Sequence, residues 1–208
     1  MLFPDWPTIL APFSTYGPTP PIEQLRALER RTKREFDSVM EKKKENNIGF
    51  WRMFHSLLLA DRGLCDDALL NRLTLSMADS ANWNQSRPGT RDALNSIAES
   101  HRIGVISNAD GKIERVLEKC GIANCFLTVT DSGIVGHEKP HPAIFAAALQ
   151  QIRAEAQECL YVGDVYSVDY VGATRAGMQA VLFDIAGAYR EDGLPRVESL
   201  TELQAALT

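Results

Sequence analysis

Two aspartates follow a short apolar run near residue 160, and their type and spacing suit them to bind a cation. The apolar run 160–162 leads directly into Gly163 and Asp164, and Asp169 follows at the start of the next expected helix. Carboxylate oxygens are the ligands that hard divalent cations prefer. A plainer interpretation is that one aspartate caps a helix and the other lies in its first turn. That alternative explains either aspartate alone, but not why an apolar strand should run directly into Gly-Asp.

A hydroxyl and an amide follow an earlier apolar run. Residues 103–106 predict a buried strand, and Ser107 and Asn108 come directly after it. A hydroxyl together with the backbone N–H groups of a strand-to-helix turn forms a cup for an anion. The alternative, that Ser107 or Asn108 only caps the next helix, explains these two residues equally well when they are considered alone.

Lys139 lies in a stretch that two prolines stiffen. Pro140 restrains the backbone beside it, and Pro142 suits the first turn of a following helix. A lysine in one fixed place can neutralise a phosphate or a crowded pair of carboxylates. A surface lysine beside a rigid turn is the alternative, and it would be preferred for Lys139 in isolation. His137 and His141 flank this lysine, but without a cysteine or a third histidine nearby they do not predict a zinc site.

The elements that must position these residues differ between the two halves of the chain. Residues 21–84 repeat apolar side chains at three- and four-residue steps, which predicts a small helical bundle without strands. The first helix should end in the polar run 41–47, and Asp66 or Asp67 should cap the third helix. From residue 87 onward, short apolar runs alternate with helices, and the chain should end in a final strand and short helix within 194–203. The predicted strands are 103–106, 126–129, 160–162 and 180–183.

Strands that alternate with helices predict an α/β fold, in which helices cover both faces of a parallel sheet. In such sheets the ligand site lies beyond the carboxyl ends of the strands. Ser107 and Asp164 each come directly after a predicted strand, so both are expected at that edge of the sheet.

The bulk composition excludes several classes of partner. The chain has 208 residues, a formal net charge of −5 and a pI of about 5.4, which gives no electrostatic reason to expect a nucleic acid or an anionic membrane. No apolar stretch approaches the ~20 residues of a membrane span, and the N-terminus lacks the pattern of a signal peptide. The four cysteines have no C-x-x-C spacing, which is typical of reduced thiols in a cytoplasmic protein. The oligomeric state cannot be predicted.

The polar residues after these strands resemble, in order, three motifs of the haloacid dehalogenase (HAD) superfamily. The matching positions are Ser107-Asn108 for the second motif, Lys139-Pro140 for the third, and Gly163-Asp164 with Asp169 for the fourth. Arg87-Pro88-Gly89 resembles the entry into the family's core, and residues 172–178 resemble the stretch after the fourth motif. The resemblance implies a Rossmann-like parallel-sheet core over 87–208 and an inserted helical cap over 15–86. Residues 1–14 would then be a remnant that follows the first motif.

The resemblance also implies a role for each of these residues. Ser107 would bind the phosphoryl group with backbone help from Asn108, Lys139 would steady the nucleophile and the phosphoryl charge, Asp164 would bind Mg²⁺ directly, and Asp169 would support that site. In the family, dehalogenases need no metal, so the two aspartates favour a magnesium-dependent phosphatase that acts on a small phosphorylated substrate. A mutase-like phosphotransferase remains open within the family.

Two further alternatives come from other functional classes. A non-catalytic relative could keep the phosphate and magnesium pocket for binding or regulation, although it would not need all four of the implied site residues. A receiver-like signalling domain would leave the helical segment 21–84 unexplained. Within that segment the candidates for substrate contact are Trp51, Arg52, His55 and Trp83. Packing or surface exposure is the more ordinary interpretation of each.

The family's first motif, an apolar strand ending in Asp-x-x-x-Thr that supplies the nucleophile, has no counterpart within residues 1–208. Asp5 follows no strand and is flanked by Pro4 and Pro7, whereas residues 1–4 resemble the stretch just after this motif. In the family, that strand lies at the centre of the sheet, between the strands that end here at Ile106 and Val162. We therefore expect a parent protein with about 10–15 more residues upstream of Met1, enough for one strand and its turn. The 208-residue chain alone should fold poorly or have a rearranged core, and it should have little activity.

Overall fold

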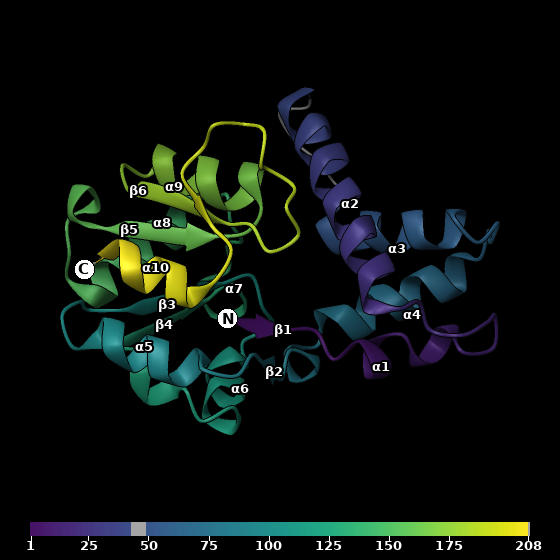
Figure 1. The fold of residues 1–208 in the computed structure, drawn as a ribbon, viewed down its shortest axis with the longest axis horizontal. Helices are drawn as coiled ribbons and strands as arrows, with labels where there is room; N and C mark the ends of the chain where they lie inside the picture. The colour runs from purple at the N-terminus through teal and green to yellow at the C-terminus, as the bar shows by residue number, and fades with distance from the viewer. Residues whose placement is uncertain (43–48, 208) are drawn as a thin grey trace.

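The computed structural model describes residues 1–42 and 49–207, which form a helical part and an α/β part (Figure 1). The helical part contains α1 (Trp6–Ile9), α2 (Ile22–Lys42), α3 (Phe50–Ala60) and α4 (Asp67–Ala78). The α/β part contains α5 (Thr90–Ala98), β3 (Gly104–Ser107), α6 (Ile113–Lys119), β4 (Thr128–Asp131), α7 (Ser132–Val135), α8 (Pro142–Ile152), β5 (Leu160–Gly163), α9 (Val171–Arg175), β6 (Gln179–Phe183), β7 (Arg196–Val197) and α10 (Leu200–Leu207). The short strands β1 (Leu2–Phe3) and β2 (Gln85–Ser86) pair antiparallel where the chain enters and leaves the helical part.

The helical part forms because its helices bury one apolar cluster between them. The buried members are Ile9, Leu10, Phe13, Leu25, Leu28, Phe54, Leu58, Leu59, Leu69, Leu73 and Met77. Asp66 caps α4 as predicted, because its carboxylate accepts a hydrogen bond from the backbone N–H of Leu69 at 2.8 Å. Most of the polar run predicted to end α2 lies outside the described residues. Among the described helices, none is both long and apolar enough to cross a membrane.

The predicted α/β fold is confirmed, with one strand displaced. The strand predicted at 126–129 lies instead at Thr128–Asp131, paired in parallel with β3 so that Ser107 lies opposite Asp131. The displacement arises because a 3₁₀ turn at Ala123–Cys125 ends in Phe126, and Leu127 remains 65% exposed. The final strand and helix also form, as β7 and α10.

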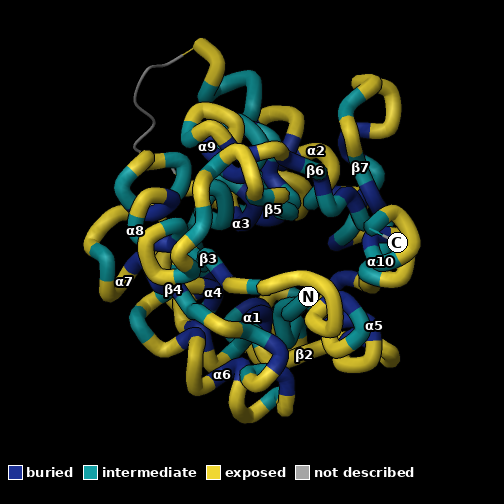
Figure 2. The backbone as a smooth tube through the Cα atoms, turned by 90° about the vertical axis from the view of Figure 1, so that its left-hand side faces the viewer, coloured by how far each residue is buried: buried dark blue, intermediate teal, exposed yellow. Residues whose placement is uncertain are grey.

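The parallel strands form two sheets instead of one. One sheet consists of β3 and β4, and the other has the order β5-β6-β7. Within the described part of the chain no ladder joins β3 to β5, and both strands line a cavity of about 1780 Å³. Apolar side chains of α8 line this cavity, as do those of α5 and α10; they include Leu94, Ile97, Ala148, Leu149, Leu200 and Leu203. Figure 2 shows buried segments on the inward sides of these elements.

His55 on α3 is a buried polar residue inside the helical part. It is fully buried, and neither of its ring nitrogens has a hydrogen-bond partner among the residues described. Burial lowers the pKa of His55 to about 4, since an imidazolium loses its hydration there.

We expect the protein to lose stability as the pH falls from about 6.5 to about 4. In this window the unfolded chain protonates His55 while the folded chain keeps it neutral, so protons favour the unfolded state. Between pH 7.5 and pH 5 the loss should be about 2 kcal/mol, measurable by urea titration. His55→Phe should remove this loss, whereas the exposed control His101→Gln should retain it. The same pH dependence in His55→Phe and in the unmodified protein would contradict the assignment.

Candidate active site

Lys139 and Asp169 form a buried ion pair at the carboxyl end of β5. The Lys139 Nζ lies 2.8 Å from Asp169 Oδ1 and 3.0 Å from the Tyr161 hydroxyl. The two charged side chains are only 12% and 4% exposed. Burial opposes the charged form of Lys139, but Asp169 and Tyr161 outweigh it and raise the pKa of Lys139 above its usual value. The ammonium is therefore permanently charged and fixed in place.

Asp169 uses both carboxylate oxygens within the protein. Its Oδ1 accepts hydrogen bonds from Lys139 and Tyr161, and its Oδ2 accepts from the backbone N–H groups of Asp164 and Val165, each at 3.0 Å. A π-helical turn at Tyr166–Tyr170 carries Asp169 into this position. Asp169 therefore shapes the loop that presents Asp164, and both of its own carboxylate oxygens are occupied by donors from the protein.

Gly163 is required for this arrangement, which explains why the strand runs directly into Gly-Asp. A Cβ atom at residue 163 would lie 2.5 Å from the Asp169 side chain, closer than real Cβ contacts allow. Only glycine lets the strand end approach the carboxylate so closely.

The Asp164 carboxylate faces the cavity and contacts a lysine from the helical part. Its Oδ2 lies 2.9 Å from the Nζ of Lys33 on α2, which also lies 2.9 Å from Glu29 Oε1. Lys33 is 1% exposed, whereas Asp164 is 51% exposed. Lys33 was not predicted as a site residue, because Glu29 and Lys33 have the spacing of an ordinary surface pair on a helix. Desolvation opposes ionisation of Asp164, but Lys33 outweighs it and lowers the pKa of Asp164.

Ser107 and Asn108 lie across the cavity at the carboxyl end of β3. The Asn108 side chain does not cap a helix; its Oδ1 accepts from the backbone N–H of Lys139 at 2.7 Å, and its Nδ2 donates to the carbonyl of Lys139 at 3.1 Å. This pair of hydrogen bonds ties the Lys139 loop to the end of β3. The loop after β3 and the loop that carries Lys139 are therefore joined directly to each other.

Asp131 fixes the loop that follows Ser107. Its carboxylate accepts hydrogen bonds from the backbone N–H groups of Gly111, Ile113 and Gly133, at 3.0, 3.2 and 2.9 Å. Asp131 was not predicted as a site residue, because the predicted strand ends two residues earlier, at Val129. A strand ending at Asp131 would have marked this residue as a position at the ligand edge of the sheet.

The residues predicted in the helical part divide between the cavity and the interior. Trp51, Arg52 and Trp83 line the cavity, whereas His55 does not. His137 and His141 stack on each other with ring centroids 4.2 Å apart. No group of three or more histidine, cysteine or acidic residues able to bind a metal exists among residues 1–42 and 49–207.

A hard divalent cation fits this site through Asp164. Its carboxylate is half-exposed at the cavity, and Lys33 lowers the pKa of Asp164, which favours the ionised form that a cation needs. Cations of this kind take oxygen ligands and keep several waters. Asp164 would bind the cation directly, and Asp169 would hold the loop that carries Asp164 in position through its hydrogen bonds to the backbone.

Comparisons with known proteins agree with this architecture. The family model for haloacid dehalogenase-like hydrolases matches residues 20–177. Haloacid dehalogenase-like hydrolase domain-containing protein 3 of Danio rerio is 30% identical over 150 residues, which cover 68% of this chain and 60% of that protein. Glyceraldehyde 3-phosphate phosphatase of Methanothermobacter thermautotrophicus is 37% identical over 97 residues, which cover 46% of this chain and 43% of that protein. The chain thus spans less than two thirds of either relative.

The fold is shared with solved structures over nearly the whole chain. The HAD-hydrolase YfnB of Bacillus subtilis matches with a TM-score of 0.70 and 18% identity, over 98% of this chain and 91% of that one. The family model covers most of the chain, including the elements that carry Ser107, Lys139, Asp164 and Asp169. The chain belongs to the haloacid dehalogenase-like hydrolase family.

Proposed function

We propose that the full-length parent of this chain is a Mg²⁺-dependent phosphomonoester phosphatase that acts on a small phosphorylated metabolite. The observation that carries the proposal is the placement of Ser107, Lys139 and Asp164 around one cavity at the carboxyl ends of β3 and β5. Two relatives bear phosphatase names, glyceraldehyde 3-phosphate phosphatase and the pyrimidine 5'-nucleotidase YjjG. The YfnB structure contains magnesium.

Each site residue would then have a defined task in phosphoryl transfer. The Ser107 hydroxyl and the backbone N–H of Asn108 would donate hydrogen bonds to phosphoryl oxygens, and the Lys139 ammonium would neutralise charge beside them. Asp164 would bind Mg²⁺ and Asp169 would support it. Bound magnesium would neutralise part of the phosphoryl charge. Groups fixed in advance in this way stabilise the charge that develops in the transition state.

The nucleophile would come from a segment that enters the cavity between β3 and β5. Such a segment could pair with both strands as a parallel neighbour and place an aspartate at their carboxyl ends, beside Lys139. Met1 lines the same cavity as Asp164. An upstream segment joined to Met1 would therefore reach the site. Its aspartate would take the phosphoryl group from the ester, the alcohol would leave, and water would then hydrolyse the aspartyl-phosphate to release phosphate.

The test is hydrolysis of p-nitrophenyl phosphate with Mg²⁺ by the full-length parent and by the 208-residue chain. We expect turnover only from the parent. Asp164→Asn should raise the Mg²⁺ concentration needed for half-maximal rate about tenfold or more, because the amide oxygen carries no charge.

Asp61→Asn is the matched control, since Asp61 pairs with Arg31 outside the cavity. It should leave the Mg²⁺ requirement unchanged. A parent that folds and binds Mg²⁺ but remains inert toward a broad panel of phosphate esters would contradict the phosphatase and favour a binding or regulatory role.

A further inference from the structure

Lys33 brings a positive charge from the helical part directly onto the carboxylate proposed to bind the cation. Its Nζ lies 2.9 Å from Oδ2 of Asp164, a residue that lines the cavity. A divalent cation would bind that oxygen at about 2.0–2.1 Å. The ammonium and the cation would then lie within a few ångströms of each other, and their like charges would repel strongly. Lys33 and the cation therefore compete for Asp164.

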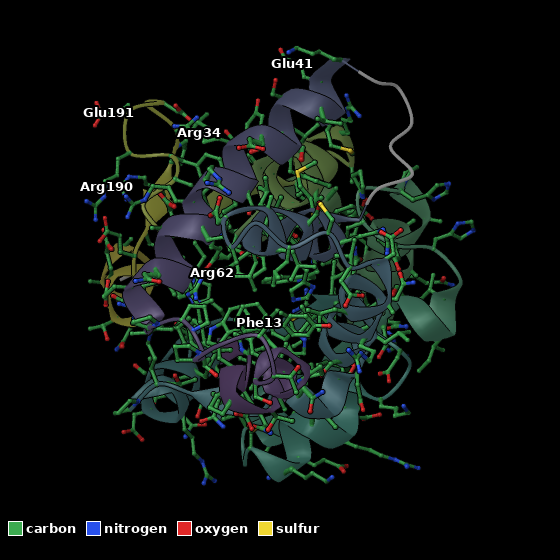
Figure 3. The ribbon with its side chains drawn as sticks, turned by 90° about the vertical axis from the view of Figure 1, so that its right-hand side faces the viewer. Phe13, Arg34, Glu41, Arg62, Arg190 and Glu191 are labelled. Carbon is green, nitrogen blue, oxygen red and sulfur yellow. The ribbon has the colours of Figure 1, made fainter. Side chains whose placement is uncertain are left out.

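Contacts on both sides of Lys33 fix its position against the α/β part. Arg30 donates from Nε to the Ala186 carbonyl at 2.7 Å. Asp37 accepts from the Tyr189 hydroxyl at 2.8 Å and from the backbone N–H of Ser167 at 2.9 Å. Arg34 pairs with Asp192, and Figure 3 shows it on the side of α2 that faces the loop with Arg190 and Glu191. α2 is thus anchored so that its lysine points into the site.

The surroundings of Lys33 suit an anion that enters beside the cation. Lys33 lines the same cavity as Ser107 and Lys139. The Asp164 carboxylate interacts electrostatically with Lys33 and also with Lys139. A phosphoryl group placed among these positive charges would replace Asp164 as the partner of the Lys33 ammonium once Asp164 has bound a cation.

Resting on the proposed phosphatase function, we propose that Lys33 is the residue through which the cap binds the phosphoryl group of the substrate. Lys33 pairs with Asp164 when no cation is bound, and it leaves this carboxylate when a divalent cation binds. Glu29 keeps the ammonium beside the cavity in both positions.

The first measurement is calorimetric titration of the full-length parent with Mg²⁺ in the absence of phosphate. Lys33→Met should bind Mg²⁺ at least about fivefold more tightly than the unmodified protein, because the competing ammonium is gone. Lys33→Arg should remain close to the unmodified protein. Arg31→Met is the matched control, since Arg31 lies on the same helix but pairs with Glu35 and Asp61 away from the cavity.

The second measurement is titration with inorganic phosphate at saturating Mg²⁺. Lys33→Met should bind phosphate about 10- to 100-fold more weakly, the effect of losing one charge-assisted hydrogen bond. Lys33→Arg should restore most of the affinity, and Arg31→Met should not change it.

The outcomes separate this inference from the proposed function. Unchanged Mg²⁺ affinity in Lys33→Met would refute the competition, and unchanged phosphate affinity would refute the phosphoryl contact. Asp164→Asn tests the site itself. If Asp164→Asn weakens Mg²⁺ binding while Lys33→Met alters neither titration, only the role of Lys33 fails; if Asp164→Asn has no effect, the proposed cation site fails.

Discussion

Replacing Lys139 with methionine should destabilise the protein by about 3–5 kcal/mol, because it leaves the buried Asp169 carboxylate without its counter-charge. Asp169 is 4% exposed, so its carboxylate would be left charged and largely desolvated. In the parent enzyme the same change should lower kcat/KM at least about 10²–10³-fold, the usual effect of removing a fixed charge-stabilising group. Urea denaturation measures the first effect and p-nitrophenyl phosphate hydrolysis the second.

A double variant separates stability from catalysis. In Lys139→Met/Asp169→Asn the buried charge is gone, and the amide oxygen can still accept from the backbone N–H groups of Asp164 and Val165. We expect at least half of the lost stability to return, without recovery of activity. Lys112→Met is the control, because Lys112 pairs with Asp110 at an exposed position and should leave the denaturation midpoint unchanged. A double variant no more stable than Lys139→Met would show that the unpaired charge of Asp169 does not cause the loss of stability.

The full-length parent should be more stable than the 208-residue chain by at least about 3 kcal/mol. A strand between β3 and β5 would bury about five aliphatic side chains at roughly 1.5–3 kcal/mol each. Ordering the backbone of these five strand residues would cost about 1–2 kcal/mol each, which leaves a net gain of a few kcal/mol before the backbone hydrogen bonds to β3 and β5 are counted. Urea denaturation of both chains measures the difference.

Hydrogen exchange locates this effect in the molecule. The backbone N–H groups of β3 and β5 that face the cavity should become protected in the parent, because a strand between them would accept their hydrogen bonds. The control is a parent with two prolines in the middle of the upstream segment. Prolines prevent this segment from pairing as a central strand, so the same N–H groups should remain unprotected. Equal stability and equal exchange in the parent and the 208-residue chain would refute a strand at this position.

The sequence predicted the elements well wherever periodic apolar residues determine them. The helices at α2 and α8, the strands β5 and β6 and the aspartate cap of α4 follow from local patterns. Strand β4 was misplaced by two residues because Phe126 and Leu127 are apolar, although a 3₁₀ turn takes up the first of them. Apolar composition alone does not distinguish the approach to a strand from the strand itself.

The positions of the candidate site residues at strand ends could be predicted from the sequence, but their contacts could not. Polar residues after strand ends identify Ser107 and Asp164 because parallel strands share one ligand edge. The separate tasks of Asp164 and Asp169 depend on a π-helical turn that no local pattern indicates. Lys33 was missed because its partner Asp164 lies far away in the sequence, and only the docking of α2 brings the two together.

The described residues of the apolar cluster in the helical part lie between Trp6 and Trp83, whereas Ile97 of α5 packs with Leu203 of α10 at the far end of the chain. Contacts between residues close in sequence cost little loop-closure entropy and form fast, whereas distant ones form slowly. The helices that carry Lys33 can therefore assemble while the rest of the chain is still being synthesised, and the α/β part then completes the site against a surface that is already folded.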